Sequence, residues 1–592
     1  MLSRTPNQGG LLLKLLLGNE AVALGAYEAG AKVASAYPGT PSTEITESLA
    51  RFDKDKIYVE WAPNEKVALE VCIGASMAGA RAICSMKHVG LNVAADPLFT
   101  ASYIGVSGGL VICVADDQGM HSSQNEQDSR HYAKASKTLM LEPSDSAECR
   151  DFVKLAFELG EKFDTPVLLR LSTRVSHSRS LVEEGVREEK EIKTYVKNPG
   201  KHVMMPGMAR LRHVLVEERT KSLIGYAEEA EINRVERNGS SIGIISSGIA
   251  YCYAKEALGD QASYLKLGMV WPLPEKLIRD FAASVEKCYV IEELDPVIET
   301  HAKSLGLDVI GKELFSPLGE YTSNAIKKAI LGDSGVDKAS GELPALPARP
   351  PVMCAGCPHR AVFYALKSIP GLVVCGDIGC YTLGTLPPLA MMDSCVCMGA
   401  SIGMALGMEK ALGKEQAKKT VAVLGDSTFL HSGITGLIDI VYNKGAATVI
   451  ILDNSITGMT GHQDNPATGF TIRKEPTRQL DLEKLCHAIG IDNVAIADPF
   501  DSKNFLKVVK ESLGSSDPSV IIAQRPCALL KTAITSDRYY ASEECIKCGI
   551  CLRIACPAIT KSDSGKPVID KNQCSGCGFC ANLCPAKAIK LV

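Results

Sequence analysis

The C-terminal region carries the most restrictive feature of this 592-residue sequence, two runs of cysteine with nearly identical spacing. The first run is Cys545, Cys548, Cys551 and Cys556, the second is Cys574, Cys577, Cys580 and Cys584, and a proline follows each fourth cysteine. Thiolates separated by two intervening residues can bind neighbouring irons of one cubane. The fourth cysteine of each run binds the other cluster. We therefore predict one [4Fe–4S] cluster on Cys545, Cys548, Cys551 and Cys584, and a second on Cys574, Cys577, Cys580 and Cys556.

This spacing is that of a bacterial two-cluster ferredoxin domain. A zinc site is the alternative, but zinc usually takes four ligands in two pairs, and two complete triplets with trailing Cys-Pro pairs exceed that number. The first run has four residues, and the second only three, before the Cys-Pro pair. We expect this difference to leave the ligation unchanged. We also expect metal to hold the segment together, because it has little hydrophobic mass of its own.

Length and composition limit what the rest of the chain can be. At roughly 100–200 residues per domain, the length predicts about four domains. Hydrophobic residues make up 46% of the sequence and the net charge is −4. This composition is that of a globular protein and offers no basic surface for nucleic acid. The leucine-rich segment 11–17 is short, contains Lys14 and lacks a cleavage site, so we expect it to pack at a domain surface. No other apolar run approaches the ~20 residues that span a membrane, and we expect a cytoplasmic protein.

Strand and helix patterns alternate through the first 175 residues. The strand candidates there are Ile57–Trp61, Ala82–Met86, Leu110–Ala115 and Pro166–Leu171, with a helical pattern over Asn64–Gly79. Ser241–Ser246 and Cys288–Glu292 predict buried strands of a further α/β domain. The charged residues at about 176–200 and the Pro-rich and Ala-rich residues 341–351 predict linkers.

Two apolar strands in the second half of the sequence end in polar residues. Val421–Leu424 is followed by Gly425, Asp426 and Ser427, and then by a helical pattern over about residues 432–442. A second strand, Thr448–Leu452, ends in the sequence Asp-Asn-Ser-Ile. Ligands of parallel α/β sheets bind at the carboxyl ends of the strands. We therefore expect these polar groups to lie together.

These polar groups suit a Mg²⁺ ion that is shared with a diphosphate. Mg²⁺ prefers octahedral oxygen ligands and few protein groups. Asp426 would supply a carboxylate, Asn454 a side-chain carbonyl and Ile456 a main-chain carbonyl, while Gly425 would let the turn approach the phosphates. The pattern GDS followed by DN is similar to the thiamine-diphosphate motif GDG…NN, with Ser427 in place of the second glycine. Taken by itself, Gly-Asp after a strand is more often an ordinary turn.

Several motifs together extend this similarity over essentially the whole chain. They are YPGTPSTE from Tyr37, CAGCPHR from Cys354, GDIGCYTLG from Gly376, GDSTFLHSG from Gly425, DNSITGMTGHQDNP from Asp453, and the cysteine runs. With them the chain resembles the 2-oxoacid:ferredoxin oxidoreductases, and most closely their indolepyruvate-oxidising branch. The resemblance implies an α/β fold with parallel-sheet thiamine-diphosphate domains and a small two-cluster ferredoxin domain.

The same resemblance implies a division into four domains. Residues 1–175 would form the pyrimidine-binding domain, and residues 200–340 a domain like the C-terminal domain of transketolase. Residues 350–535 would bind the diphosphate and Mg²⁺. Residues 536–592 would form the ferredoxin domain.

Two residues of the first domain take catalytic roles in this resemblance. Glu65 would be the carboxylate that faces the cofactor aminopyrimidine, where it favours the tautomer that removes the reactive proton of the cofactor. From the pattern alone, Glu65 is an acidic first-turn residue that complements a helix dipole. Thr40, in the Pro-Gly-Thr-Pro turn, would line the substrate site. Glu44, Lys87 and His88 are weaker candidates for that site.

The resemblance further implies a third, proximal [4Fe–4S] cluster near the thiamine. In this chain its ligands would be Cys354, Cys357, Cys380 and Cys527. A lone CxxC pair is common, and the nearby Cys375, Cys395 and Cys397 are left unassigned. Cysteines in apolar runs, such as Cys72, Cys113 and Cys288, are expected to be buried small hydrophobes.

The implied reaction is oxidative decarboxylation of an arylpyruvate, such as indolepyruvate or phenylpyruvate. Electrons would pass to an external ferredoxin, and coenzyme A would take the acyl group. A separate beta subunit, in an α₂β₂ assembly, would complete the enzyme. The alternatives are another 2-oxoacid substrate, a non-oxidative arylpyruvate decarboxylase, the reverse, carboxylating direction, and an electron-transfer scaffold with a vestigial thiamine site.

Overall fold

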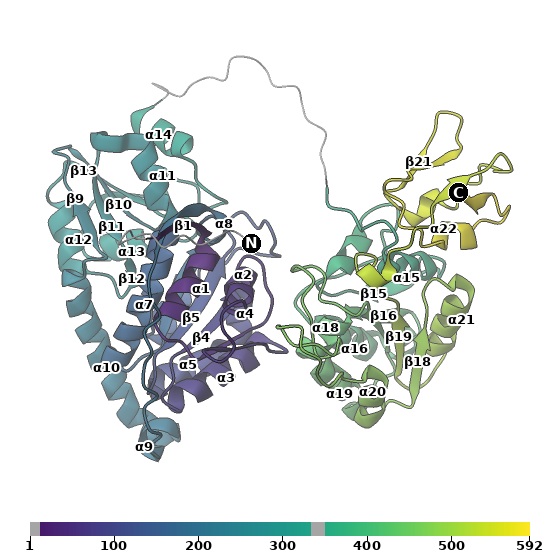
Figure 1. Ribbon diagram of the computed structural model, residues 1–592, viewed down its shortest axis with the longest axis horizontal. Coiled ribbons are helices and arrows are strands. Elements are labelled where there is room, and N and C mark those ends of the chain that lie inside the picture. The colour runs from purple at the N-terminus through teal and green to yellow at the C-terminus, as the bar shows by residue number, and fades with distance from the viewer. Residues whose placement is uncertain (1–11, 333–349) are drawn as a thin grey trace. The chain divides into compact units, whose positions relative to one another are not determined.

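The structure is a computed structural model that describes residues 12–332 and 350–592. It has two compact units, residues 1–342 and 343–592, which run from purple to teal and from green to yellow in Figure 1. Leu11 and most of the predicted linker 341–351 lie outside the described residues. The finer division into four domains stays a prediction.

A seven-stranded sheet forms the centre of the first unit, with the order β12-β6-β7-β5-β4-β2-β3. Its strands are β2 (Val33–Ala36), β3 (Tyr58–Trp61), β4 (Ala82–Lys87), β5 (Leu110–Asp116), β6 (Leu139–Leu141), β7 (Val167–Ser172) and β12 (Met269–Trp271). All neighbours are parallel except β12 and β6. Every residue of β4, β5 and β7 is buried, which explains their mostly apolar sequences. The four strands that the sequence predicts here are confirmed.

Helices cover both faces of this sheet, as parallel strands require. They are α1 (Gly18–Glu28), α2 (Thr43–Leu49), α3 (Glu65–Met77), α4 (His88–Val93), α5 (Ala95–Ile104), α6 (Arg130–Ser136), α7 (Ser146–Phe163) and α8 (Thr173–His177). Helix α1 packs against α2 and α7, and α3 packs against α5. The helical pattern over Asn64–Gly79 is confirmed as α3, and the Asn64 side chain caps it by accepting from Val67 N at 2.9 Å.

The prediction that residues 176–200 are an irregular linker is wrong in its first part. β8 (Arg179–Glu184) pairs antiparallel with β1 (Leu12–Leu17), which confirms that the leucine-rich segment packs at a surface. Just beyond β8, the Arg187 guanidinium lies 4.6 Å from the centre of the Tyr27 ring and donates to Tyr27 O at 2.6 Å. Charged residues here make contacts with α1. Such long-range contacts cannot be predicted from the local sequence.

The remainder of the first unit is a second α/β sheet with the order β14-β13-β10-β11-β9. Its strands are β9 (Arg234–Glu236), β10 (Ile242–Ser247), β11 (Ser263–Leu267), β13 (Lys287–Ile291) and β14 (Val309–Ile310). Its helices are α9 (Pro199–His202), α10 (Pro206–Glu229), α11 (Gly248–Leu258), α12 (Glu275–Ala282), α13 (Val297–Ser304) and α14 (Ser323–Leu331), and α10 runs along the outside of the unit in Figure 1. The two predicted strands are confirmed as β10 and β13. Strand β12 belongs to the same stretch of sequence but pairs with β6, so it joins the two sheets.

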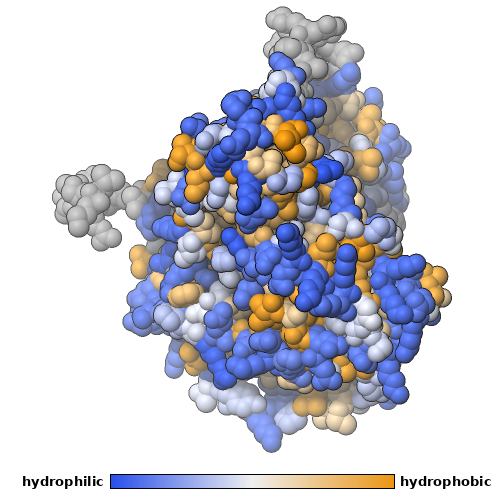
Figure 2. Space-filling model, turned by 90° about the vertical axis from the view of Figure 1, so that its right-hand side faces the viewer, coloured by the Kyte–Doolittle hydropathy of each residue, from blue (hydrophilic) through white to orange (hydrophobic). Residues whose placement is uncertain are grey.

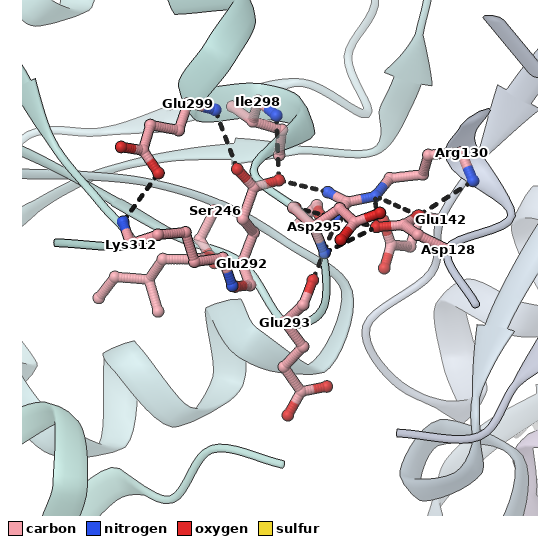
Figure 3. Close-up of polar contacts among 12 residues, drawn as sticks. Asp128, Arg130, Glu142, Ser246, Glu292, Glu293, Asp295, Ile298, Glu299 and Lys312 are labelled. Carbon is pink, nitrogen blue, oxygen red and sulfur yellow. Dashed lines mark hydrogen bonds and ion pairs between the residues drawn. The ribbon is translucent and has the colours of Figure 1, made fainter. Parts of the chain in front are cut away.

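Buried charges also join the two sheets of the first unit (Figure 3). Arg130, only 1% exposed, donates from Nε to Asp128 Oδ1 at 2.9 Å and from Nη1 to Glu292 Oε2 at 2.5 Å. Glu292 also accepts from the main-chain nitrogens of Ile298 and Glu299 at 3.0 and 2.9 Å. A buried ion pair is stable only when its remaining hydrogen-bonding groups are satisfied. This network therefore fixes the loop after β13 against the loop before α6.

Glu293 is expected to destabilise the first unit as the pH rises. Burial raises its pKa from 4.5 to about 7, although it accepts from Tyr321 N at 2.9 Å. Between these two values the folded protein keeps a proton that the unfolded chain has lost, so stability falls with rising pH. Two to three pKa units correspond to about 3 kcal/mol. We expect Glu293→Gln to increase the free energy of unfolding by up to that amount at pH 8, with the gain vanishing toward pH 4.5.

Urea unfolding followed by tryptophan fluorescence tests this prediction. Both tryptophans of the chain, Trp61 and Trp271, lie in the first unit, so the signal reports this unit alone. Glu286→Gln is the matched control, because Glu286 is exposed in the same part of the unit. A gain that is equal at pH 5 and pH 8 would show that burial of the Glu293 charge is not its cause.

The second unit contains a five-stranded parallel sheet with the order β15-β16-β17-β19-β18. Its strands are β15 (Val373–Cys375), β16 (Thr420–Gly425), β17 (Thr448–Asp453), β18 (Asn493–Ala497) and β19 (Ser519–Gln524). Its helices are α15 (Pro358–Leu366), α16 (Ala400–Leu412), α17 (Lys414–Ala417), α18 (Asp426–Thr428), α19 (Ile434–Tyr442), α20 (Leu482–Ile489) and α21 (Ser502–Leu513). The strands predicted at 421–424 and 448–452 are confirmed. The predicted helix at 432–442 begins earlier, because α18 continues through a π-helical turn, Phe429–Gly433, into α19.

The C-terminal segment packs on this sheet domain within the same unit, beside α15 in Figure 1. It has two short antiparallel strand pairs, β20 (Tyr539–Ala541) with β23 (Ile589–Leu591) and β21 (Ile559–Lys561) with β22 (Pro567–Ile569), and one turn of α-helix, α22 (Phe579–Asn582). The ring of Phe579 stacks on that of Phe500 at 4.9 Å between centroids. The segment thus takes part of its small core from the neighbouring domain.

The surface of the second unit is mostly hydrophilic, with separate small hydrophobic patches on the face that Figure 2 shows. Scattered exposed apolar residues of this kind are ordinary for folded proteins. Across residues 12–332 and 350–592, no helix combines the length and the apolar character that crossing a membrane requires.

Candidate functional site

The side chains predicted to hold Mg²⁺ lie together at the carboxyl ends of neighbouring strands. Asp426 follows β16 and Asn454 follows β17, and these strands pair in parallel with Gly425 opposite Leu452. Asp426 is 2% exposed and Asn454 is 7% exposed. The Asn465 side chain, which the sequence did not single out, donates from Nδ2 to Asp426 Oδ2 at 3.3 Å. Only its place in the motif after Asn454 could have indicated it.

Asp426 has the surroundings of a metal-binding carboxylate. Burial and, to a smaller extent, the neighbouring carboxylate of Asp453 together raise its pKa to about 7. A buried acid beside a second acid favours a bound cation, and oxygen ligands of this kind suit Mg²⁺. The donor set therefore fits the ion that the sequence predicts.

A buried histidine lies against Asn454 and orients its amide. Asn454 Nδ2 is 3.4 Å from Nε2 of His359, and Asn454 Oδ1 accepts from Ile456 N at 3.3 Å. Burial lowers the pKa of His359 to about 4, so the ring is neutral and its nitrogen can accept from the amide. Sequence reasoning missed His359, although it lies inside the CAGCPHR motif.

Gly425 and Ser427 flank Asp426 in a crowded turn. A Cβ atom at Gly425 would lie 3.0 Å from Cε1 of Tyr381, so a larger residue would press on that ring. Ser427 is 7% exposed in α18, and Ile456 is 6% exposed. The turn is therefore packed tightly around the predicted Mg²⁺ ligands.

The four cysteines proposed for a proximal cluster approach the same strand ends. Cys527 N donates to Asn454 O at 3.0 Å, and Cys380 Sγ lies 3.7 Å from a Cβ position built at Gly458. Burial raises the pKa of the Cys380 thiol to about 11, and the nearby Cys527 and Cys354 act in the same direction. Burial likewise raises the pKa of Cys357 to about 12, with Cys354 and Cys380 close enough to add to it. The four cysteines thus lie near one another, with Cys380 and Cys527 beside Asn454.

Two of the unassigned cysteines are engaged elsewhere. Cys375 is buried in β15, with its sulfur 3.7 Å from Met408 Sδ. The Cys395 thiol donates to Asp377 O at 3.6 Å. Cys72, Cys113 and Cys288 are buried as expected.

The eight C-terminal cysteines lie near one another in two groups, and their assignment to two clusters stays a prediction. Cys556, Cys574, Cys577 and Cys580 line one cavity together. Burial raises the pKa of the Cys551 thiol, and the nearby Cys545, Cys548 and Cys584 raise it further. Across the described residues, no three His, Cys, Asp or Glu side chains are close enough to share one metal ion. A cubane places its four thiolates on four different irons, so its ligands are spaced more widely than those of a single zinc ion.

In the first unit, Glu65 is buried at the first position of α3, 5% exposed. A Cβ atom at Gly90 would lie 2.6 Å from Glu65 Oε1, so this glycine makes room for the carboxyl group. Sequence reasoning had not singled out Gly90.

Lys87 connects the surroundings of Glu65 with the Thr40 turn. A Cβ atom at Gly39, next to Thr40, would lie 3.1 Å from Cβ of Lys87. Burial lowers the pKa of Lys87 to about 8, while Asp117 and Glu65 oppose that shift. Thr40 is partly buried and precedes a cis proline. His88 is 1% exposed, and its ring nitrogens find no hydrogen-bond partner within the described part of the chain.

Three family descriptions match this chain in sequence order. Residues 24–239 match "Pyruvate flavodoxin/ferredoxin oxidoreductase, thiamine diP-bdg". Residues 377–523 match "Thiamine pyrophosphate enzyme, C-terminal TPP binding domain". Residues 567–590 match "4Fe-4S binding domain". Asp426 and Asn454 lie inside the second match, and Glu65 and Thr40 inside the first.

Curated proteins similar over the full length carry one name. An indolepyruvate oxidoreductase subunit IorA from Archaeoglobus fulgidus is 42% identical over 97% of this chain and 97% of that protein. The IorA subunits of Pyrococcus horikoshii and Methanothermobacter thermautotrophicus are 39% and 40% identical, over 98% and 97% of this chain and 97% of each protein. A solved 2-oxoglutarate:ferredoxin oxidoreductase from Magnetococcus marinus is 18% identical over 54% of this chain and 65% of that chain, with a TM-score of 0.47. This chain belongs to the family of the indolepyruvate ferredoxin oxidoreductase alpha subunits, which are thiamine diphosphate-dependent iron–sulfur enzymes.

Proposed function

We propose that this chain, with a separate beta subunit, oxidatively decarboxylates arylpyruvates such as indolepyruvate and phenylpyruvate. Coenzyme A would take the acyl group and an external ferredoxin the electrons. The names of the full-length relatives support the substrate class. The observation in the structure that carries the proposal is the position of Cys380 and Cys527 beside Asn454. This position supports an electron acceptor close to the proposed Mg²⁺ site.

The residues of the chain divide the work in this proposal. When bound, thiamine diphosphate would supply the carbanion chemistry of decarboxylation, and the clusters would accept single electrons. Asp426, Asn454 and the carbonyl of Ile456 would hold Mg²⁺ against the diphosphate. Glu65 would hold a proton at the cofactor pyrimidine, and Thr40 would line the substrate site.

An anaerobic dye-reduction assay tests the proposal on the purified chain co-expressed with its beta partner. It compares indolepyruvate, phenylpyruvate, pyruvate and 2-oxoglutarate, each with and without coenzyme A. Reduction that depends on coenzyme A and prefers the aromatic acids is the expected result. Preference for pyruvate or 2-oxoglutarate would overturn the substrate class. Release of CO₂ without dye reduction would instead indicate a non-oxidative decarboxylase.

The proximal cluster can be tested by iron analysis of a single variant. Cys527→Ala is expected to carry about four iron atoms fewer per chain than the wild type, because it removes one ligand of a four-iron cluster. Thiamine content should stay unchanged. Chemical determination of iron and thiamine in anaerobically purified protein measures both.

Cys397→Ala is the control, because Cys397 is exposed and lies outside the proposed ligand set. It should keep the iron content of the wild type. The opposite result is about eight irons per chain in both the wild type and Cys527→Ala. It would be consistent with the two C-terminal clusters alone and would contradict the proximal cluster.

A further inference from the structure

Arg360 is a buried cation that lies where the diphosphate domain meets the C-terminal segment of the same unit. It is 3% exposed, at the start of α15, three residues after Cys357. Its Nη1 donates to the carbonyl oxygens of Ile554, at 3.0 Å, and Ala555. Its Nη2 donates to the carbonyl oxygens of Met353 and Cys354 at 2.6 and 3.1 Å. One guanidinium thus joins the CxxC loop to the ferredoxin domain.

Within the described part of the chain, no carboxylate balances the charge of Arg360. All four of its hydrogen-bond acceptors are main-chain carbonyls, and across residues 12–332 and 350–592 no carboxylate pairs with it. Its Nε is buried and finds no acceptor among the described residues. An unpaired buried charge is strongly unfavourable in a folded protein. Among the described residues the compensating negative charge is not a carboxylate, which leaves the nearby cysteine thiolates and whatever group they bind.

Cysteine sulfurs surround this cation. Arg360 and Cys357 line the cavity that Cys556, Cys574, Cys577 and Cys580 also line. Burial lowers the pKa of Arg360, while Cys556, Cys357, Cys354 and Cys577 raise it. Two of these four cysteines belong to the CxxC loop and two to the ferredoxin domain.

We propose that Arg360 is the shared counter-ion of the cluster bound by Cys354 and Cys357 and the cluster bound by Cys556 and Cys577. This inference rests on the cluster assignments of the proposed function. A [4Fe–4S] cluster with four thiolates is negatively charged in both oxidation states and gains one more negative charge on reduction. When an electron passes between the two clusters, one is oxidised and the other reduced, and no bond or proton changes. A fixed positive charge between them stabilises each reduced form and raises its reduction potential.

The test compares reduction potentials of variants of the full-length chain, by anaerobic titration followed by electron paramagnetic resonance. Arg360→Gln removes the charge and is expected to make reduction of the ferredoxin-domain cluster about tenfold less favourable. For a one-electron couple, that factor is a shift of about 59 mV to more negative potential. Arg360→Lys keeps the charge and should stay near the wild-type potential. Arg553→Gln removes an exposed arginine of the same domain and should leave the potential unchanged.

Iron content and potential together decide the outcome. A fully loaded Arg360→Gln chain with the wild-type potential would overturn the proposal. If Arg360→Gln fails to load iron, Arg360→Lys decides, because a loaded chain with the wild-type potential supports the charge role. A failure of both variants to load would assign Arg360 to packing alone and overturn the inference.

The same experiment separates this inference from the proposed function. A wild-type chain with about eight irons, rather than the about twelve of three clusters, lacks the proximal cluster. That result would overturn the proximal cluster in the proposed function. The cluster of Cys556, Cys574, Cys577 and Cys580 would still be present in such a chain. Its shift in Arg360→Gln would then decide whether Arg360 acts as a counter-ion.

Discussion

Replacement of Asp426 by asparagine is expected to abolish 2-oxoacid oxidation while the iron content stays unchanged. The carboxylate is 2% exposed at the end of β16, and the neighbouring charge that acts on it is the acidic Asp453. Asparagine keeps the shape of the side chain but removes the charge that would hold Mg²⁺. A metal contributes several kcal/mol to such a site, so we expect at least about a thousandfold loss of kcat/KM.

Two measurements on Asp426→Asn check this prediction. Thiamine released from the gel-filtered protein should fall to background, and dye reduction with indolepyruvate should be lost. Asp439→Asn is the matched control, because Asp439 is exposed on α19 of the same domain. A variant that keeps both its thiamine and its activity would remove Asp426 from the cofactor site, whereas loss of iron as well would show that the domain had not folded.

The second large effect is expected from Glu65→Gln. The glutamine has the size of glutamate but cannot exchange a proton with the cofactor. General acid–base groups typically contribute about a hundredfold to ten-thousandfold, and we expect kcat to fall within that range. Thiamine binding should be retained, because the diphosphate is held by other residues. Steady-state dye reduction, with thiamine content measured in parallel, tests both statements.

The alternative role for Glu65 is to complement the dipole at the start of α3, and a control on the same helix separates the two. Glu70→Gln makes the same change at an exposed position of α3, where Glu70 pairs with Lys66. It should leave kcat unchanged. Gly90→Ala should reduce activity as well, because the new Cβ would lie 2.6 Å from Glu65 Oε1. A Glu65→Gln enzyme with nearly full kcat and only a lower unfolding midpoint would assign Glu65 to the helix dipole.

The predictions from sequence that the structure confirms are those that depend on short stretches of chain. Buried parallel strands are apolar on both faces, so β4, β5, β16 and β17 can be recognised from a few consecutive residues. Asp426 and Asn454 lie close together for the same reason, because the ends of adjacent parallel strands meet at one edge of the sheet, while their role as Mg²⁺ ligands stays a prediction. The cysteine sets also depend on local spacing, since the spacing within each run limits which thiolates reach one cluster, and their ligation stays a prediction.

The tertiary structure decided the features that depend on residues far apart in the sequence. The charged segment after residue 176 has no local pattern that predicts a strand. Strand β8 forms because its main chain pairs with the distant strand β1. No local pattern indicates that β12 joins the first sheet or that Arg130 donates to Glu292.

The same reason explains which site residues the sequence left out. His359 and Arg360 stand next to recognised cysteines, yet their roles depend on Asn454 and on the carbonyls of Ile554 and Ala555. These partners lie about one hundred to two hundred residues further along the chain. Local spacing thus determines which groups can bind iron or Mg²⁺. Tertiary packing decides which buried histidine or arginine lies next to these groups. The hydrogen-bond partner of a buried polar group depends on which residues the fold places within reach.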